Sequence, residues 1–319
     1  MEMKNVRKSS LKERLNKLIP SLFTLIASLV LAATCCAGQQ TPPYAVAQIP
    51  APVLNTPEFT AVFGGSDGRS LGLDSSGLIR EVEFVALPGT PFRIEGSIHR
   101  GSRTIYRVTT DEYPYQTKTG YFIDSRFVTT ANYPQQPRPR QLPSKQKVID
   151  NLLAAQGSRY VWGGNFRAGI PQLLFFYPPA SGSSLSDSTR EMWQLAGVDC
   201  SGLIYEATNG FTPRNTSSLV EYGRTVPIAG LDPMKIVERL EPLDLIVWSG
   251  HVLIVLDRER VIESRLDSGG HGGGVRVRPL RDALIELLKG RVPLDEFPSA
   301  TARGVKGFVI RRWYPDGGR

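Results

Sequence analysis

The chain has 319 residues, enough for two domains of ordinary size, and carries 38 Lys and Arg against 30 Asp and Glu. Half of its net charge of +8 lies in residues 1–20, which hold six basic and two acidic side chains. The small excess that remains argues against a nucleic-acid-binding protein and supports at most a weak attraction to an anionic cell wall.

The N-terminal segment has the features of an export signal. Its basic start is followed by an apolar run over residues 22–33, which is as long as a signal-peptide core and short for a membrane span. We therefore expect residues 1–38 to be a signal peptide and the protein to reach the periplasm or cell envelope. Cys35 and Cys36 leave lipid attachment open, so membrane association is expected only through the leader or a lipid anchor.

The next part of the chain indicates a tether and a small β-domain. Residues 39–57 are rich in Pro, Ala and Gln without a period, which predicts a flexible tether. Residues 58–131 contain short alternating runs separated by Gly and Pro turns, which predict an all-β domain. Its turns and its final strand resemble the bacterial SH3-like barrels that accompany cell-wall hydrolases.

A second Pro-rich stretch, residues 132–144, predicts a semi-rigid linker before the last domain, residues 145–319. An amphipathic helix is expected at 145–156 and another at 201–208. Strands are expected at 244–248, 251–256 and 261–263. Helices followed by antiparallel strands predict an α+β fold for this domain.

Cys200 is the candidate nucleophile. With Cys35 and Cys36 in the export region, it is the single cysteine of the body of the protein and has no disulfide partner there. Asp199 precedes it and can cap a helix whose first turn contains Cys200. A helix N-terminus stabilises the thiolate form of cysteine, so a lowered pKa is expected. A small buried structural cysteine is the alternative.

A thiolate nucleophile needs a base that later protonates the leaving amine, and histidine suits both tasks. His99 lies in the predicted β-domain, and His271 lies in a Gly-rich loop too flexible to hold a base in place. His251 opens an apolar strand, which is a rigid position. His251 is therefore the predicted general base.

A third group should orient the imidazole through its other ring nitrogen. The predicted strand after His251 returns beside it, and Glu263 is the polar residue best placed there. Because hairpin register cannot be read from sequence, Asp257 and Ser264 remain alternatives.

Five short motifs follow one another along the chain. They are Y-V-W-G-G from Tyr160, D-C-S-G from Asp199, P-R-N-T-S from residue 213, L-D-L from residue 243, and H-V at His251. In that order they resemble the NlpC-type papain-like peptidases of bacterial cell walls, over residues 145–265. The resemblance implies a papain-like α+β fold, with Cys200 as nucleophile and His251 as base.

The resemblance also implies roles for three residues around the nucleophile. Tyr160 would line the site and the oxyanion position, while Asp199 and Ser201 would contact the amino end of a peptide substrate. Two features depart from the family pattern: its third catalytic position is usually His, Asn or Gln rather than Glu263, and residues 165–198 form a long insertion. That insertion would either form a wall of the substrate cleft or add residues to the core and a surface loop.

The expected function is therefore a peptidoglycan hydrolase, a D,L-endopeptidase that cuts the γ-D-glutamyl–diaminopimelate bond of stem peptides. The same dyad would also serve an N-acetylmuramoyl-L-alanine amidase or an acyl transfer, and a non-catalytic wall-binding module is a further alternative. No cofactor and no metal are expected, because no paired Cys/His spacing occurs. The expected partner is the stem peptide, with no nucleic acid, and the expected state is a monomer.

Overall fold

The computed structural model describes residues 42–65, 67–180, 184–267, 272–298 and 306–315, and Pro42–Arg319 form one compact unit. The expected signal peptide, with Cys35 and Cys36, lies outside the described residues, as does His271. Within the described ranges, no helix combines the length and apolar character needed to cross a membrane.

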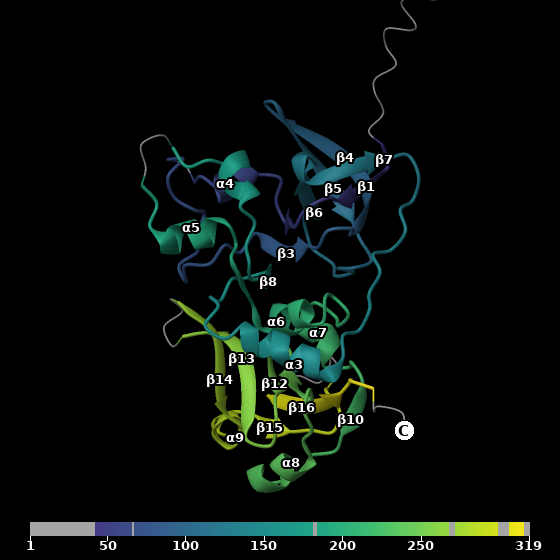
Figure 1. Cartoon of the computed structure of the whole chain (residues 1–319), viewed down its shortest axis with the longest axis vertical. Helices are drawn as coiled ribbons and strands as arrows, with labels where there is room; N and C mark the ends of the chain where they lie inside the picture. Colours follow the sequence, from purple (N-terminus) through teal and green to yellow (C-terminus); the bar gives the residue numbers. More distant parts are fainter. Residues whose placement is uncertain (1–41, 66, 181–183, 268–271, 299–305, 316–319) are drawn as a thin grey trace, which may run out of the picture. The chain divides into compact units, whose positions relative to one another are not determined.

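The first sheet is antiparallel and has the strand order β3-β2-β6-β5-β4-β1-β7 (Figure 1). Its strands are β1 (Tyr44–Ala47), β2 (Ala51–Leu54), β3 (Val82–Ala86), β4 (Pro91–Arg100), β5 (Arg103–Thr109), β6 (Tyr121–Asp124) and β7 (Val128–Ala131). A short helix, α2 (Phe59–Val62), and a 3₁₀ turn, η1 (Ser125–Phe127), complete this part. The predicted β-structure is present, but the pairings of these described strands do not close, so the SH3-like barrel is not confirmed.

Strands β1 and β2 fall inside the segment 39–57, where a flexible tether was expected. Ala45, Ala47, Ala51 and Val53 are buried in the core of the first sheet. Two short apolar runs are therefore ordered by pairing with distant strands, a contribution that the Pro-rich and Ala-rich composition conceals. This part of the tether prediction is wrong.

The linker 132–144 contains no helix or strand but is held against its surroundings. Arg138 in this segment is buried, pairs with Glu112 at 3.2 Å and donates to the carbonyl of Asn209 at 3.0 Å. A side chain that is ion-paired on one side of the linker and bonded on the other fixes the path of the chain.

The second sheet has the order β10-β16-β11-β12-β13-β14, with β15 paired to β16. All of these pairs are antiparallel except β15 with β16. The strands are β10 (Arg224–Val226), β11 (Leu245–Trp248), β12 (His251–Val255), β13 (Arg260–Leu266), β14 (Gly273–Pro279), β15 (Val292–Pro293) and β16 (Gly307–Arg312). The strands predicted from sequence at β11, β12 and β13 are confirmed, as is the mixed α/β composition with mainly antiparallel sheets.

Helices cover both faces of this sheet (Figure 1). They are α3 (Lys145–Ala154), α6 (Cys200–Ala207), α7 (Thr216–Leu219), α8 (Pro233–Arg239) and α9 (Leu280–Leu288). Val252 and Ile254 pack in a core with α3 and α6, whereas Leu253 and Val255 pack with α8 and α9. This alternation is the period of a strand buried on both sides.

The segment between α3 and α6 carries a two-stranded pair and two short helices. They are β8 (Asn165–Phe166), β9 (Gly197–Val198), α4 (Gln172–Phe176) and α5 (Asp187–Trp193). This is the insertion noted in the sequence, and β9 leads directly into the helix that begins at Cys200.

Candidate active site

Cys200 is the first residue of α6, as predicted. The side chain of Asp199 caps the helix by accepting a hydrogen bond from the backbone N–H of Gly202 at 2.7 Å. A Cβ atom at Gly202 would lie 2.0 Å from the carbonyl oxygen of Gly164, so only glycine lets the helix approach this loop. The D-C-S-G motif thus combines a cap, a thiol and a close backbone contact.

The sulfur of Cys200 is buried rather than activated. Cys200 is 8% exposed, and its thiol donates to the carbonyl of Gly250 at an Sγ–O distance of 3.9 Å. Burial, followed by the nearby charge of Asp199, raises the pKa of the Cys200 thiol to about 12. The expected lowering of this pKa by the helix N-terminus is therefore wrong, because desolvation of the thiolate outweighs it.

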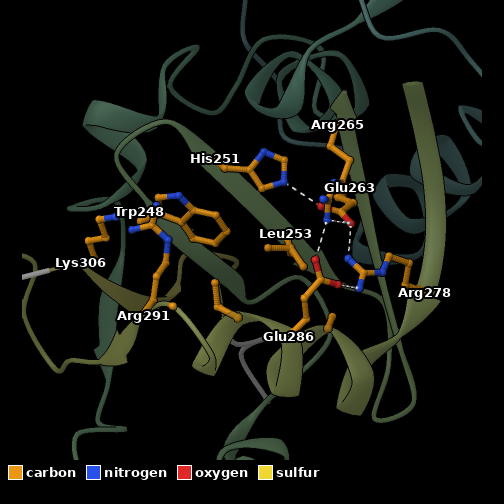
Figure 2. A pocket seen from close by; sticks show the side chains of 12 residues that line it. Trp248, His251, Leu253, Glu263, Arg265, Arg278, Glu286, Arg291 and Lys306 are labelled. Atoms are coloured by element: carbon orange, nitrogen blue, oxygen red, sulfur yellow. Dashed lines mark hydrogen bonds and ion pairs between the residues drawn. The ribbon is translucent and has the colours of Figure 1, made fainter. Parts of the chain in front are cut away.

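His251 and Glu263 form a short hydrogen-bonded pair (Figure 2). The Nε2 atom of His251 lies 2.7 Å from Oε2 of Glu263. Strands β12 and β13 pair Ile254 with Ile262, so Glu263 points to the same face of the sheet as His251. The register of the hairpin thus creates the contact.

The two alternatives for the third group have other partners. Asp257 holds the turn by bonding the guanidinium of Arg260 at 2.8 Å, and Ser264 donates to the carbonyl of Val198 at 2.7 Å. Of the three candidates, Glu263 is the residue that the structure joins to the imidazole.

The carboxylate of Glu263 is buried in a cluster of positive charge. Its side chain is 1% exposed, and Oε1 accepts a hydrogen bond from Arg278 at 2.8 Å. Burial alone would raise the pKa of Glu263, but hydrogen bonds from His251 and Arg278 outweigh it and lower the pKa to about 2. The ionised carboxylate only accepts, so Nε2 of His251 carries a proton and Nδ1 of the neutral ring keeps a free lone pair.

The structure does not join Cys200 to His251 by a hydrogen bond among the described residues. Instead the sulfur contacts Gly250, the residue before His251, and so lies beside the backbone at the start of β12. The two residues of the predicted dyad therefore lie in the same region. The thiol of Cys200 points to the carbonyl of Gly250, and the imidazole of His251 is bonded to Glu263.

Arg214 is a part of this site that sequence reasoning missed. Its side chain is 3% exposed; Nη2 lies 2.7 Å from Oδ2 of Asp199, and Nη1 donates to the hydroxyl of Ser201 at 3.0 Å. Both carboxylate oxygens of Asp199 are engaged by Arg214. Contact of Asp199 and Ser201 with a peptide amino group stays a prediction. Arg214 lies in the P-R-N-T-S motif, so the sequence singled out this segment but did not indicate that Arg214 binds Asp199.

Asn165 connects the same arginine to the first sheet. Its side-chain oxygen accepts from Arg214 Nε at 3.0 Å and from the backbone N–H of Val85 at 2.9 Å, and its amide donates to the Val85 carbonyl at 2.8 Å. The buried amide therefore pairs with Val85, in β3, much as a neighbouring strand would.

Tyr160 lines a cavity. A cavity of about 230 Å³ lies between it, Trp162, Met192 and the loop around Leu78. Burial, with the charges of Asp199 and Cys200 adding to it, raises the pKa of the Tyr160 hydroxyl. The phenol therefore keeps its proton and remains a hydrogen-bond donor at neutral pH.

The insertion 165–198 contributes several buried side chains to the core. Ile170, Leu173, Tyr177 and Trp193 are buried in the cluster that also holds the first sheet. Met192 lines the cavity beside Tyr160. The expected addition to the core is confirmed, and one side chain also reaches a cavity wall.

His99, in β4, contacts the hydroxyl of Thr104 at 3.2 Å and is exposed. No group of three or more His, Cys, Asp or Glu side chains among the described residues is arranged to hold a metal ion.

No protein-family model matches the chain, and no curated protein matches it. A solved NlpC/P60 family protein from Bacillus cereus is 16% identical, with a TM-score of 0.32, over 88% of this chain and 66% of that one. The match thus spans slightly less than two thirds of that protein. RipD from Mycobacterium tuberculosis, described as a non-catalytic NlpC/p60 domain protein adapted to peptidoglycan binding, is 20% identical, with a TM-score of 0.28, over 44% and 89%. The structural neighbours are thus NlpC/P60 proteins, at a similarity too low to assign membership.

Proposed function

We propose that this protein is a cysteine peptidase that cuts the γ-D-glutamyl–diaminopimelate bond of peptidoglycan stem peptides. The observation that carries the proposal is the His251–Glu263 pair, at 2.7 Å, together with the contact of the Cys200 thiol with Gly250, the residue before His251. A buried anion that fixes a histidine next to a lone cysteine is the arrangement that thiol catalysis requires. The ordered motifs that resemble NlpC-type peptidases supply the substrate class.

The mechanism begins from a neutral thiol. Nδ1 of His251 takes the proton of Cys200, which turns from the Gly250 carbonyl, and the sulfur attacks the γ-carbonyl carbon. The C–N bond then breaks, and the imidazolium gives its proton to the leaving amine. Water attacks the resulting thioester, releasing the γ-carboxylic acid and restoring the thiol.

The charges that develop have partners on the chain. Glu263 stabilises the imidazolium form of His251, and Arg278 holds Glu263 in place. The oxyanion would be held by the backbone N–H of Cys200 and the protonated hydroxyl of Tyr160. We further propose export through the 1–38 leader, with the domain boundaries predicted from the sequence apart from β1 and β2.

A second candidate function is a wall-binding module without catalysis. The observation that favours it is the buried Cys200 thiol, whose pKa is raised to about 12 and whose hydrogen bond goes to a backbone carbonyl. In such a protein the cavity beside Tyr160 would bind stem peptide without turnover.

Digestion of purified muropeptides followed by mass spectrometry tests the proposal. The endopeptidase releases fragments with a new diaminopimelate amino terminus, whereas an amidase releases whole stem peptides from the muramoyl lactyl group. Intact muropeptides after incubation with the wild-type protein, together with measurable binding, would favour the module.

A further inference from the structure

A second cavity opens from the catalytic histidine toward the C-terminal part of the chain (Figure 2). It has a volume of about 440 Å³ and runs from His251 and Glu263 to Arg291, between the end of β11 and α9. Much of its wall is supplied by residues of the range 278–291 and by Lys306, which lie beyond the 145–265 region that carries the motifs. This wall is therefore not explained by the motif resemblance.

The cavity is lined by more positive than negative charge. Four cationic side chains line it against two carboxylates, those of Glu263 and Glu286. Arg278 bonds both carboxylates, and Arg265 bonds Glu286 at 3.3 Å. The remaining cations of the lining are Arg291 and Lys306.

Arg291 has no carboxylate partner among the described residues. Its guanidinium donates to the carbonyl of Gly307 at 3.4 Å and lies 4.5 Å from the centre of the Trp248 ring. Partial burial lowers the pKa of Arg291, as expected for a cation that has lost water without gaining an anion. Lys306, on the same wall, also lacks a described acidic partner.

The position of His251 gives this cavity a place in the reaction. His251 donates a proton to the leaving amine in the proposed mechanism, so the residue that leaves must sit against His251. Trp248 lies between His251 and Arg291. The centre of its ring is 5.2 Å from the centre of the His251 ring, and the guanidinium of Arg291 lies over the same indole ring. A side chain on the leaving residue can follow this wall to Arg291.

We infer that the cavity is the subsite for the leaving residue and that Arg291, assisted by Lys306, selects a leaving residue that bears a side-chain carboxylate. This inference rests on the proposed function for the identity of the leaving residue. Arg291 is a specificity-determining residue in this account, because a guanidinium binds a carboxylate with two parallel hydrogen bonds.

Two substrates that differ by one carboxylate provide the test. Synthetic stem peptides carry either meso-diaminopimelate or lysine at the leaving position, which removes the side-chain carboxylate and little else. The wild-type kcat/KM should favour the diaminopimelate peptide by roughly 10- to 100-fold. Arg291→Gln should reduce this ratio to near one, and Arg291→Lys should retain part of it.

Arg281→Gln is the matched control, since Arg281 is an exposed residue of α9 that does not line the cavity. It should leave the ratio intact. A wild-type ratio near one, or a large ratio that persists in Arg291→Gln, would overturn the inference while hydrolysis itself upheld the proposed function.

Binding separates the two claims if the protein does not hydrolyse either peptide. Calorimetric titration of the Cys200→Ala variant should give a lower Kd for the diaminopimelate peptide, and adding Arg291→Gln should remove the difference. That result would support the inference that the cavity selects a carboxylate, while the lack of hydrolysis would contradict the proposed peptidase activity. Equal Kd values for both peptides in Cys200→Ala would reject carboxylate selection.

Discussion

The Glu263 carboxylate lies 2.7 Å from Nε2 of His251 and is itself held by Arg278 at 2.8 Å. A buried carboxylate in this position fixes the tautomer of the imidazole and offsets the positive charge that the ring gains during the reaction. The same contact therefore affects both catalysis and the response of the fold to acid.

Replacing Glu263 should lower the rate of hydrolysis. Glu263→Ala should lower kcat/KM by about 10²–10⁴-fold, because the imidazole loses its orientation and its counter-charge. Glu263→Gln should cost less, since an amide oxygen can still accept the Nε2 proton. A kcat/KM of Glu263→Ala equal to that of the wild type would show that the carboxylate does not act on the base.

The stability of the protein should fall in acid through the same carboxylate. The pKa of Glu263 is lowered from its ordinary value of 4.5 to about 2. A group with a lowered folded pKa stabilises the fold above its unfolded pKa and loses that contribution as the pH falls through its folded pKa. The free energy of unfolding from urea titrations should therefore drop by about 3 kcal/mol at most between pH 5 and 2 through this group. Glu263→Gln should show a shallower decline, and an identical decline in both proteins would contradict this assignment.

The Cys200 thiol should react slowly with iodoacetamide in the absence of substrate. With its pKa raised to about 12, the thiolate fraction at pH 7 is about 10³-fold below that of an ordinary cysteine. Alkylation, assigned to Cys200 by peptide mass spectrometry, should rise about tenfold per pH unit up to pH 10. A plateau below pH 8 would indicate a preformed thiolate–imidazolium pair instead.

Removing Arg214 should destabilise the fold strongly. Arg214→Met leaves the buried Asp199 carboxylate without its partner, and breaking one side of such a pair costs about 3–5 kcal/mol. Asp199→Asn combined with Arg214→Met should recover part of that loss. Arg281→Met, at an exposed site, should stay within about 0.5 kcal/mol of the wild type in the same urea titrations. Equal, small losses for both single variants would mean that the ion pair contributes little.

Local features of the site were predictable from sequence. The helix start at Cys200 and its Asp199 cap depend on neighbouring residues, and the β12–β13 hairpin is short enough for Glu263 to be identified beside His251. These contacts span few residues, so propensity and strand alternation determine them.

The missed features depend on residues far apart in the chain. Arg278 reaches Glu263 only because β14 pairs with β13, and Arg214 reaches Asp199 only after α6 and α7 pack. The pKa of Cys200 was predicted in the wrong direction because the helix start is visible in sequence, whereas the burial of the sulfur depends on the whole fold. Strands β1 and β2 were missed for the same reason, since their partners are distant strands.

The most direct test of the account compares muropeptide hydrolysis by the wild-type protein and by Cys200→Ala, with released amino groups measured under identical conditions. The account predicts cleavage by the wild-type protein at the γ-D-glutamyl–diaminopimelate bond and a loss of at least about 10³-fold in Cys200→Ala. Equal rates of product formation by the two proteins would contradict it.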